Sequence, residues 1–202
     1  MNVIETIEYK GHVISVSPDD NPSDPRENDN LGTMICFHRR YNLGDKHKFS
    51  DSQEFLEWLK ENKNDIAICL PIFMYEHSEV SLSTSNKKYP FNDRWDAGQV
   101  GIVYVTKETL KKEYPIDQPQ EKTIEIATNV LVAEVEEYSR YLNGDIYGYQ
   151  ISATEGSPKL CTDSCWGFDD MNYMIDEAKA AIDYAIEDEL KEKKETCLIM
   201  AI

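Results

Sequence analysis

The chain has 202 residues, with 38 acidic and 21 basic side chains and a formal net charge of −17 at pH 7. This length suits one domain with a sizeable core, and the charge disfavours nucleic acid and membrane surfaces as partners. No apolar run approaches the roughly 20 residues that span a bilayer, and the N-terminus lacks the features of a signal peptide. We therefore expect a cytoplasmic protein whose partners are basic.

The five cysteines are expected to be reduced and structural. Cys36, Cys69 and Cys197 lie inside apolar runs, where a reduced cysteine behaves as a small hydrophobic residue. Cys161 and Cys165 have three residues between them, whereas zinc and redox motifs have two. An odd number of cysteines without a secretion signal also argues against a disulfide framework.

The first half of the chain alternates between short strands and polar connections. Residues 3–16 carry apolar side chains on both sides of Lys10-Gly11, in an alternating pattern that predicts a β-hairpin. Residues 17–31 are rich in Pro, Asp and Asn and are expected to form a polar loop. The segment from Ser50 to Gln53 has the pattern of a capping box and predicts a helix over about residues 51–62. Buried strands are predicted at 34–37, 66–75 and 80–83.

The second half contains two long amphipathic helices. Residues 121–142 place their apolar side chains on one stripe with the helical period, and Asn143-Gly144 ends this helix. A second helix of this kind is predicted over 170–193. Further strands are predicted at 100–105, 145–152 and 197–202, with a short helix after Thr106. Strands and helices mix without a βα repeat, so we expect an α+β fold: a single domain, 1–202, with a mixed or antiparallel sheet packed against both helices.

Several sequence blocks carry a resemblance to a known family. The most specific is Trp95-Asp96 with Gly98-Gln99-Val100-Gly101, followed by Tyr104-Val105. Other matching blocks are Asn30–Gly32, His38–His47, Tyr75–Ser78, Tyr141–Tyr149 and Asp163–Phe168. Over roughly residues 30–185 the chain resembles a family of uncharacterised proteins from bacteriophages and prophages of low-GC Gram-positive bacteria.

The resemblance implies a phage-encoded protein that acts in the cytoplasm of the host cell. It has one departure, because the family often reads Pro-Phe-Ser-Cys-Pro-Trp-Asp-Ser where this chain has Pro90 to Ala97. Asp93 and Ala97 stand where the family has that cysteine and the final serine, so no role of either residue is carried over to this chain.

Polar residues capable of chemistry gather within these blocks. The candidates for one pocket, and for catalysis if the protein is an enzyme, are His38, Asp45, His47, His77, Asp96 and Gln99. Histidine and carboxylate are ligands for Zn, Fe or Mn, but no compact metal-binding spacing is present, and we expect no metal and no cofactor. The same residues would equally suit hydrogen bonding inside a polar core. If the pocket forms, Trp95, Asp96 and Gln99 are expected to lie close to His38 or His77.

Two main functions remain open from the sequence, beside a third reading as a structural or accessory phage protein with neither role. The first is a phage-encoded inhibitor of a host defence protein, of the anti-CRISPR or anti-restriction type, whose acidic surface imitates nucleic-acid phosphates in a basic channel. The candidate contact residues lie on the second long helix: Asp176, Glu177, Asp183, Glu187 and Asp188. The alternative is a small phage enzyme or ligand-binding domain built on the His/Asp/Gln pocket. We favour the inhibitor because no catalytic motif stands out.

Overall fold

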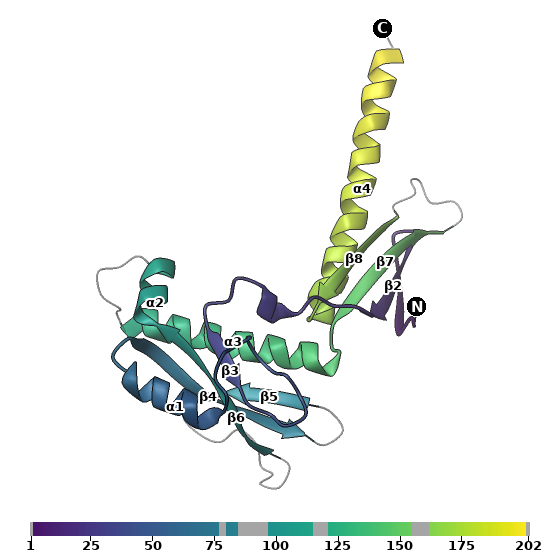
Figure 1. Cartoon of the computed structure of the whole chain (residues 1–202). Coiled ribbons are helices and arrows are strands. Elements are labelled where there is room, and N and C mark those ends of the chain that lie inside the picture. The colour runs from purple at the N-terminus through teal and green to yellow at the C-terminus, as the bar shows by residue number, and fades with distance from the viewer. Residues whose placement is uncertain (1, 77–79, 85–96, 115–120, 155–161, 201–202) are drawn as a thin grey trace. The chain divides into compact units, whose positions relative to one another are not determined.

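The computed structural model describes the chain apart from residues 1, 77–79, 85–96, 115–120, 155–161 and 201–202, and for 193–200 it describes only the backbone (Figure 1). Contacts divide the chain into two compact units: unit 1 is Met1–Ser23 with Gly144–Ile202, and unit 2 is Asp24–Asn143. The predicted α+β class is confirmed, but within the described residues the strands form two four-stranded antiparallel sheets instead of one sheet. Among the same residues, no helix combines the length and the apolar character needed to cross a membrane.

Unit 1 is a sheet covered on one face by a helix. Its strands follow the order β1-β2-β7-β8, and neighbouring strands are antiparallel. The predicted hairpin is confirmed: Lys10 and Gly11 form its turn with φ of 46° and 76°, the left-handed values that a tight two-residue turn requires. The elements are β1 (Glu5–Tyr9), β2 (His12–Pro18), β7 (Tyr147–Ala153), β8 (Asp163–Phe168) and α4 (Met171–Met200).

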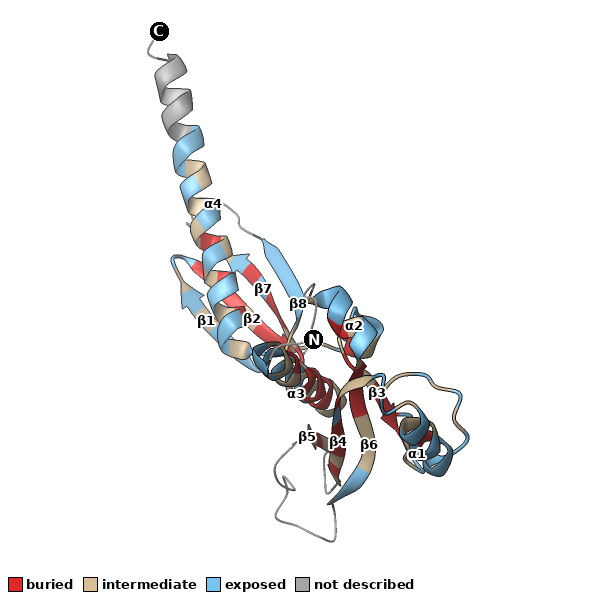
Figure 2. Cartoon of the chain, turned by 90° about the vertical axis from the view of Figure 1, so that its left-hand side faces the viewer, coloured by how far each residue is buried: buried red, intermediate tan, exposed pale blue. Residues whose placement is uncertain are grey.

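The core of unit 1 lies between α4 and the sheet. The fully buried residues are Ile14 and Val16 of β2, two positions apart as on one face of a strand, and Met174, Ala178 and Ile182 of α4, four positions apart as on one face of a helix. Figure 2 shows the buried residues of α4 and of the strands of this sheet in red. Ile186 is the last α4 residue in this core, and the helix continues past the sheet (Figure 1). The predicted strand over 197–202 is wrong for residues 197–200, which continue α4 instead.

Unit 2 is a sheet with helices on both faces. Its antiparallel strands follow the order β3-β6-β4-β5. Leu131 of α3 packs with Val103 on one face, and Phe55 of α1 packs with Tyr104 on the other, since adjacent strand residues point to opposite faces. The elements are η1 (Pro25–Glu27), β3 (Thr33–Cys36), α1 (Ser52–Glu61), β4 (Ile66–Glu76), β5 (Val80–Thr84), β6 (Ala97–Thr106), α2 (Lys107–Glu113) and α3 (Glu121–Asn143).

The two predicted long helices correspond to α3 and α4, but they do not share a sheet. The apolar stripe of α3 packs on the sheet of unit 2, and that of α4 packs on the sheet of unit 1. The alternation of apolar residues identifies the inner face of a strand but not its neighbour, so the sequence pattern alone did not separate the two sheets.

Side-chain caps fix where the first two helices of unit 2 begin. Asp51 caps α1 by accepting a hydrogen bond from Glu54 N at 2.9 Å, and Glu54 accepts one from Ser50 N at 2.6 Å. This reciprocal pair lies one residue later than the predicted cap at Ser50, because Asp51 is the last extended residue before the helix. Thr106 caps α2 as predicted, accepting from Thr109 N at 3.1 Å.

Replacement of Leu131 tests the assigned core of unit 2. Leu131 is fully buried, so we expect Leu131→Ala to lower the free energy of unfolding by about 2–5 kcal/mol. Ile126 lies on the same helix but is 42% exposed, so Ile126→Ala should have a much smaller effect. Urea denaturation of both variants measures the difference, and equal losses would contradict the inner face assigned to α3.

Candidate functional site

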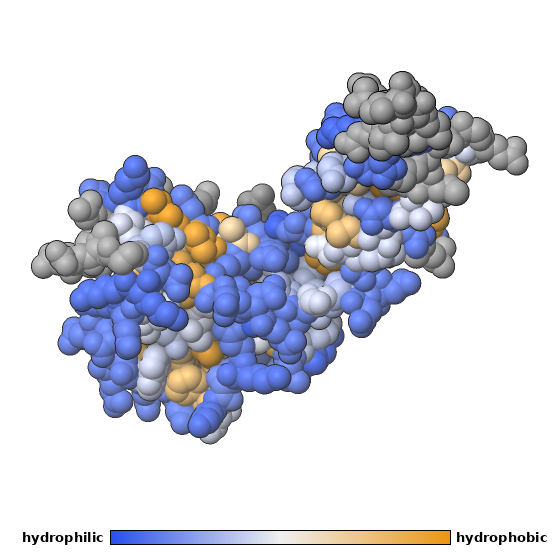
Figure 3. Space-filling model, turned by 90° about the horizontal axis from the view of Figure 1, so that it is seen from above, coloured by the Kyte–Doolittle hydropathy of each residue, from blue (hydrophilic) through white to orange (hydrophobic). Residues whose placement is uncertain are grey.

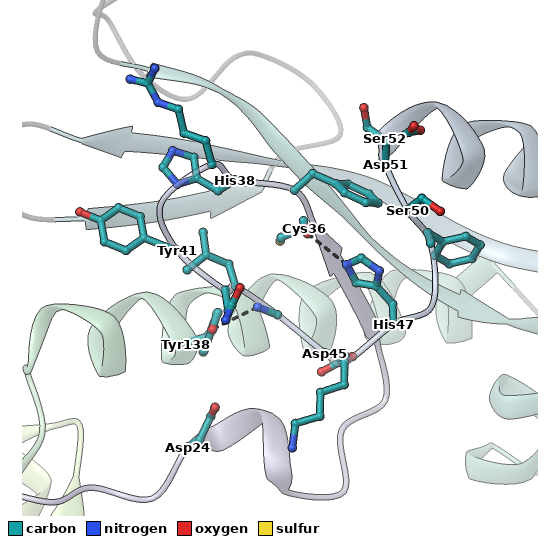
Figure 4. A pocket seen from close by; sticks show the side chains of 17 residues that line it. Asp24, Cys36, His38, Tyr41, Asp45, His47, Ser50, Asp51, Ser52 and Tyr138 are labelled. Atoms are coloured by element: carbon teal, nitrogen blue, oxygen red, sulfur yellow. Dashed lines mark hydrogen bonds between the residues drawn. The ribbon is translucent and has the colours of Figure 1, made fainter.

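A long connection between β3 and α1 lines a cavity of unit 2. The connection runs from Phe37 to Asp51 and contains no helix or named strand, and loops of this length in compact domains are usually functional or disordered. We call it the β3–α1 loop. Together with Asp24 and Tyr138 it encloses a cavity of about 770 Å³ (Figure 4).

A buried arginine fixes the middle of this loop. The Arg26 side chain is only 3% exposed, and its Nε and Nη2 donate to the two carboxylate oxygens of Asp45, each at 2.9 Å. Nη2 also donates to the carbonyl oxygen of Gly32 at 2.7 Å, and Nη1 lies 3.4 Å from Glu134 Oε2. Burial lowers the pKa of Arg26, but its bonds to Asp45 and the nearby Glu134 charge outweigh this and raise the pKa, so the guanidinium stays charged.

Asp45 and Glu134 also bind backbone amides. Asp45 Oδ2 accepts from Met34 N at 2.8 Å, and Glu134 Oε1 accepts from Leu31 N at 2.6 Å. Glu134 Oε2 accepts from Gly32 N at 3.1 Å, and a Cβ on Gly32 would lie 2.3 Å from a Leu131 methyl carbon. Asp45 was a sequence candidate for catalysis, but its oxygens are occupied by Arg26 and Met34, so its role here is to hold the loop.

A second anchor joins the loop to α3. Gly44 N donates to the hydroxyl oxygen of Tyr138 at 3.0 Å, and Gly44 has φ of +73° (Figure 4). A Cβ at this position would lie 2.5 Å from the carbonyl oxygen of Met34, so both the conformation and the space require glycine. Leu43 beside it is buried in the core of unit 2.

His38 belongs to a surface cluster at one side of the cavity. Its ring stacks on Tyr41 with centroids 5.1 Å apart, and its Nδ1 accepts a long hydrogen bond from Arg40 N at 3.4 Å (Figure 4). Its Nε2 lies 4.0 Å from Glu76 Oε2. Glu76 also accepts a hydrogen bond from the Tyr41 hydroxyl at 3.1 Å and forms an ion pair with Arg40. The Glu76 carboxylate therefore contacts all three residues of the cluster.

His47 lies deeper, between two phenylalanines. Its Nε2 is 3.3 Å from the carbonyl oxygen of Cys36, which can only accept, so Nε2 carries the hydrogen (Figure 4). The other nitrogen, Nδ1, is then an acceptor in the neutral ring, and it is buried without a hydrogen-bond partner among the described residues. The ring centroids of Phe37 and Phe49 lie 4.8 and 5.9 Å from that of His47.

The structure thus brings together three of the six pocket candidates. His38, Asp45 and His47 line the cavity, whereas Gln99 is exposed on β6 and donates to the Gly101 carbonyl oxygen at 3.3 Å. His77 and Asp96 lie outside the described residues, as does Trp95, so the expected proximity of these residues stays a prediction.

Sequence reasoning missed Arg26, Glu76, Glu134 and Tyr138 as organisers of the site. Glu134 left a usable signal, because it lies three residues after Leu131 and four before Tyr138, on the apolar side of the 121–142 helix. A carboxylate at such a position needs a buried cation or several donors. The sequence does not reveal that the cation is Arg26, which lies 108 positions away.

Cys36 is a poor nucleophile in the described cavity. Cys36 lines it, but burial, together with the Asp45 charge, raises the pKa of the Cys36 thiol to about 12, so the thiolate is scarce near neutral pH. Within the described ranges, no cluster of three or more His, Cys, Asp or Glu side chains has the arrangement of a metal site.

The acidic candidates on α4 differ in their surroundings. Asp176, Glu177 and Glu187 are exposed, and Asp188 is half-buried. Asp183 instead joins α4 to the β1–β2 hairpin: it accepts from Lys10 Nζ at 2.7 Å and from the Tyr9 hydroxyl at 3.2 Å. The hydrogen bond from Lys10 lowers the pKa of Asp183, which keeps this carboxylate charged in its pair.

Comparisons with protein-family models, with curated proteins and with solved structures found no match. The resemblance of the sequence blocks to a phage family stays a prediction.

Removal of the buried guanidinium should destabilise unit 2. Arg26→Met leaves Asp45 and Glu134 without their cation, so we expect the free energy of unfolding to fall by about 3–5 kcal/mol. Arg39 is exposed, and Arg39→Met is the matched control with little expected effect. Thermal and urea denaturation measure both changes, and an Arg26→Met protein as stable as wild type would show that the network does not hold the loop.

Alkylation rates should distinguish the buried Cys36 from the exposed Cys165. With a pKa of about 12, on the order of one Cys36 thiol in ten thousand is ionised at pH 8, and the residue is buried. We expect iodoacetamide to modify the exposed Cys165 in the folded protein and Cys36 only after denaturation. Peptide mass spectrometry over time gives the rates; rapid modification of native Cys36 would contradict its burial.

Proposed function

We propose that the protein acts by binding a basic surface of another protein through the outer face of α4. We define this face as Tyr173, Asp176, Glu177, Tyr184 and Glu187, which lie opposite the buried Met174, Ala178 and Ile182. The observation that carries the proposal is the combination, on one exposed stripe, of carboxylates with two unusually exposed aromatic rings.

The tyrosines distinguish this stripe from an ordinary solvated helix face. Tyr173 is 57% exposed and Tyr184 is 72% exposed, and they lie eleven positions apart, which is three helical turns. Tyrosine is enriched in protein interfaces because a rigid ring contributes contact area and a hydroxyl hydrogen bond. Glu177 lies close enough to Tyr173 that its charge raises the pKa of the tyrosine hydroxyl.

The charge of the chain supports a basic partner. A net charge of −17 attracts a cationic surface over several ångströms and raises the rate of encounter at low salt. Lys179 lies 3.9 Å from Asp176, beside this face. The view in Figure 3 is dominated by hydrophilic residues, with apolar groups in small patches. A highly charged partner is therefore better matched than an apolar one.

The partner class follows from the resemblance of the sequence to phage proteins. A nucleic-acid-binding defence protein of the host, such as a restriction or CRISPR effector, offers a channel lined by Arg and Lys. Carboxylates at Asp176 and Glu187 lie about 16 Å apart along the helix at 1.5 Å per residue, and would occupy sites meant for phosphates. The protein would then inhibit by occupancy, in the cytoplasm and without a cofactor.

The alternative, an enzyme or ligand-binding domain, has one observation in its favour. His38, Asp45 and His47 converge on one cavity. Because Asp45 is neutralised by Arg26 and Cys36 is held as the thiol, ligand binding is better supported there than catalysis.

Charge reversal tests the proposal. We expect the wild-type protein, expressed in a bacterium with an active restriction or CRISPR system, to raise the plating efficiency of a targeted phage. The triple variant Asp176→Lys, Glu177→Lys and Glu187→Lys should lose this protection, because the contact carboxylates become cations. For a purified target, binding by the wild type should weaken steeply with added salt.

The control variant carries the same change of charge elsewhere. Glu61, Glu113 and Glu125 are exposed on unit 2, and their reversal to lysine should leave protection intact. Equal loss in both triple variants would mean that only total charge matters. Retained protection in the α4 triple variant would refute the proposed face.

A further inference from the structure

We infer that the outer edge of β8 binds an extended, basic segment of the partner protein, which adds to the sheet of unit 1 as a further antiparallel strand. This rests on the proposed function, since it specifies which kind of segment a basic partner presents beside α4. Strand addition is a common mode of peptide recognition, in which main-chain hydrogen bonds give affinity and alternate side chains give specificity.

The edge of β8 is open among the described residues. β8 is the last strand of its sheet and pairs only with β7. Five of its six residues are exposed, and Figure 2 shows most of the strand in pale blue. Edge strands of soluble proteins often carry lysine or proline, which deter pairing with another chain, and β8 contains neither.

Two backbone amides of β8 point to this open edge. Ser164 lies opposite Gln150 of β7, but its N–H donates to Oδ1 of Asp163 at 2.8 Å. In an antiparallel pair, alternate residues direct their N–H and C=O groups to opposite edges, so Trp166 points the same way as Ser164, and Cys165 points toward β7. The register is regular over this stretch. A carbonyl oxygen of an added strand can therefore replace Asp163 at the Ser164 amide and bind Trp166 as well.

One flank of α4 borders the same edge. The ring centroid of Tyr173 lies 6.1 Å from that of Phe168, the last residue of β8. Glu177 lies about one helical turn beyond Tyr173 and is exposed, and Tyr184 follows on this flank after two more turns. The opposite flank is occupied, because Asp183 is bonded to the β1–β2 hairpin. Tyr173 and Glu177 are thus positioned to face a strand added to β8.

The side chains around the edge favour a segment that alternates basic and apolar residues. Asp163 lies opposite Ile151, a core residue, so its exposed carboxylate is on the same face of the sheet as α4 and Glu177. The other face presents Ser164 and the indole of Trp166, which is 36% exposed. Basic side chains on the α4 side would meet carboxylates, whereas a second copy of this acidic chain would bring like charges together.

Calorimetric titration of the full chain with a blocked octapeptide of alternating valine and lysine tests the inference. With the lysines toward α4, the valines lie opposite Ser164 and Trp166, so the valine N–H groups are the ones that donate to β8. N-methylation of two central valines should weaken binding by about tenfold or more, because two hydrogen bonds are lost. N-methylation of two central lysines gives an isomeric peptide of equal charge, which should bind like the unmethylated one.

Changes on the protein side test the same two amides. Ser164→Pro removes one N–H from the open edge and keeps every charge, and proline is tolerated at the outer edge of a sheet, so this variant should fold and bind the peptide more weakly. Hydrogen exchange on the wild type covers the case in which it does not fold. In the complex the amides of Ser164 and Trp166 should exchange more slowly, whereas the amide of Cys165 should not change.

Three results would overturn the added strand: no binding of the unmethylated peptide at millimolar concentration, equal binding of the two methylated peptides, or unchanged exchange at Ser164 and Trp166. Sedimentation that shows the wild type, but not Ser164→Pro, as a dimer would assign the edge to a second copy instead. The phage assay separates this failure from that of the proposed function. Protection that is lost in the α4 triple variant, without edge pairing, leaves the acidic face standing and refutes only the strand.

Discussion

A single buried guanidinium determines the geometry of unit 2 around its longest described loop. Arg26 contacts Gly32 before β3, Asp45 within the loop and Glu134 on α3. Burying charge is costly, so an ion pair of this kind adds little net stability, and its better attested effect is to specify one arrangement. Here the Arg26 guanidinium fixes how the segment before β3, the β3–α1 loop and α3 meet. The backbone amides bound by the two carboxylates extend the same constraint along the chain.

The cavity depends on that constraint. A loop of this length would lose much conformational entropy on ordering, and the contacts of Asp45, Gly44 and Leu43 offset this loss at its centre. The side chains on either side of these anchors, His38 and His47, are thereby presented on opposite parts of one cavity (Figure 4). Burial and the Asp45 charge raise the pKa of the Cys36 thiol beside this cavity, which disfavours nucleophilic attack by Cys36 near neutral pH.

Two different kinds of surface therefore belong to two different units. Unit 1 exposes carboxylates and the rings of Tyr173 and Tyr184 on a helix that buries Met174, Ala178 and Ile182 on its other side. Unit 2 offers a cavity of about 770 Å³ lined by the β3–α1 loop and Tyr138. Because their residues do not overlap, each can be changed without altering the other.

The sequence by itself determined the local elements: the hairpin at Lys10-Gly11, the cap at Thr106 and the apolar stripe around Leu131 all follow from neighbours along the chain. It also placed three site residues near one another, because they share a loop. Only the tertiary structure decided that β7 pairs with β2, that the strands form two sheets, and that Glu134 meets Arg26. Periodicity reports which face of an element is buried, whereas the partner of that face depends on contacts between residues more than a hundred positions apart.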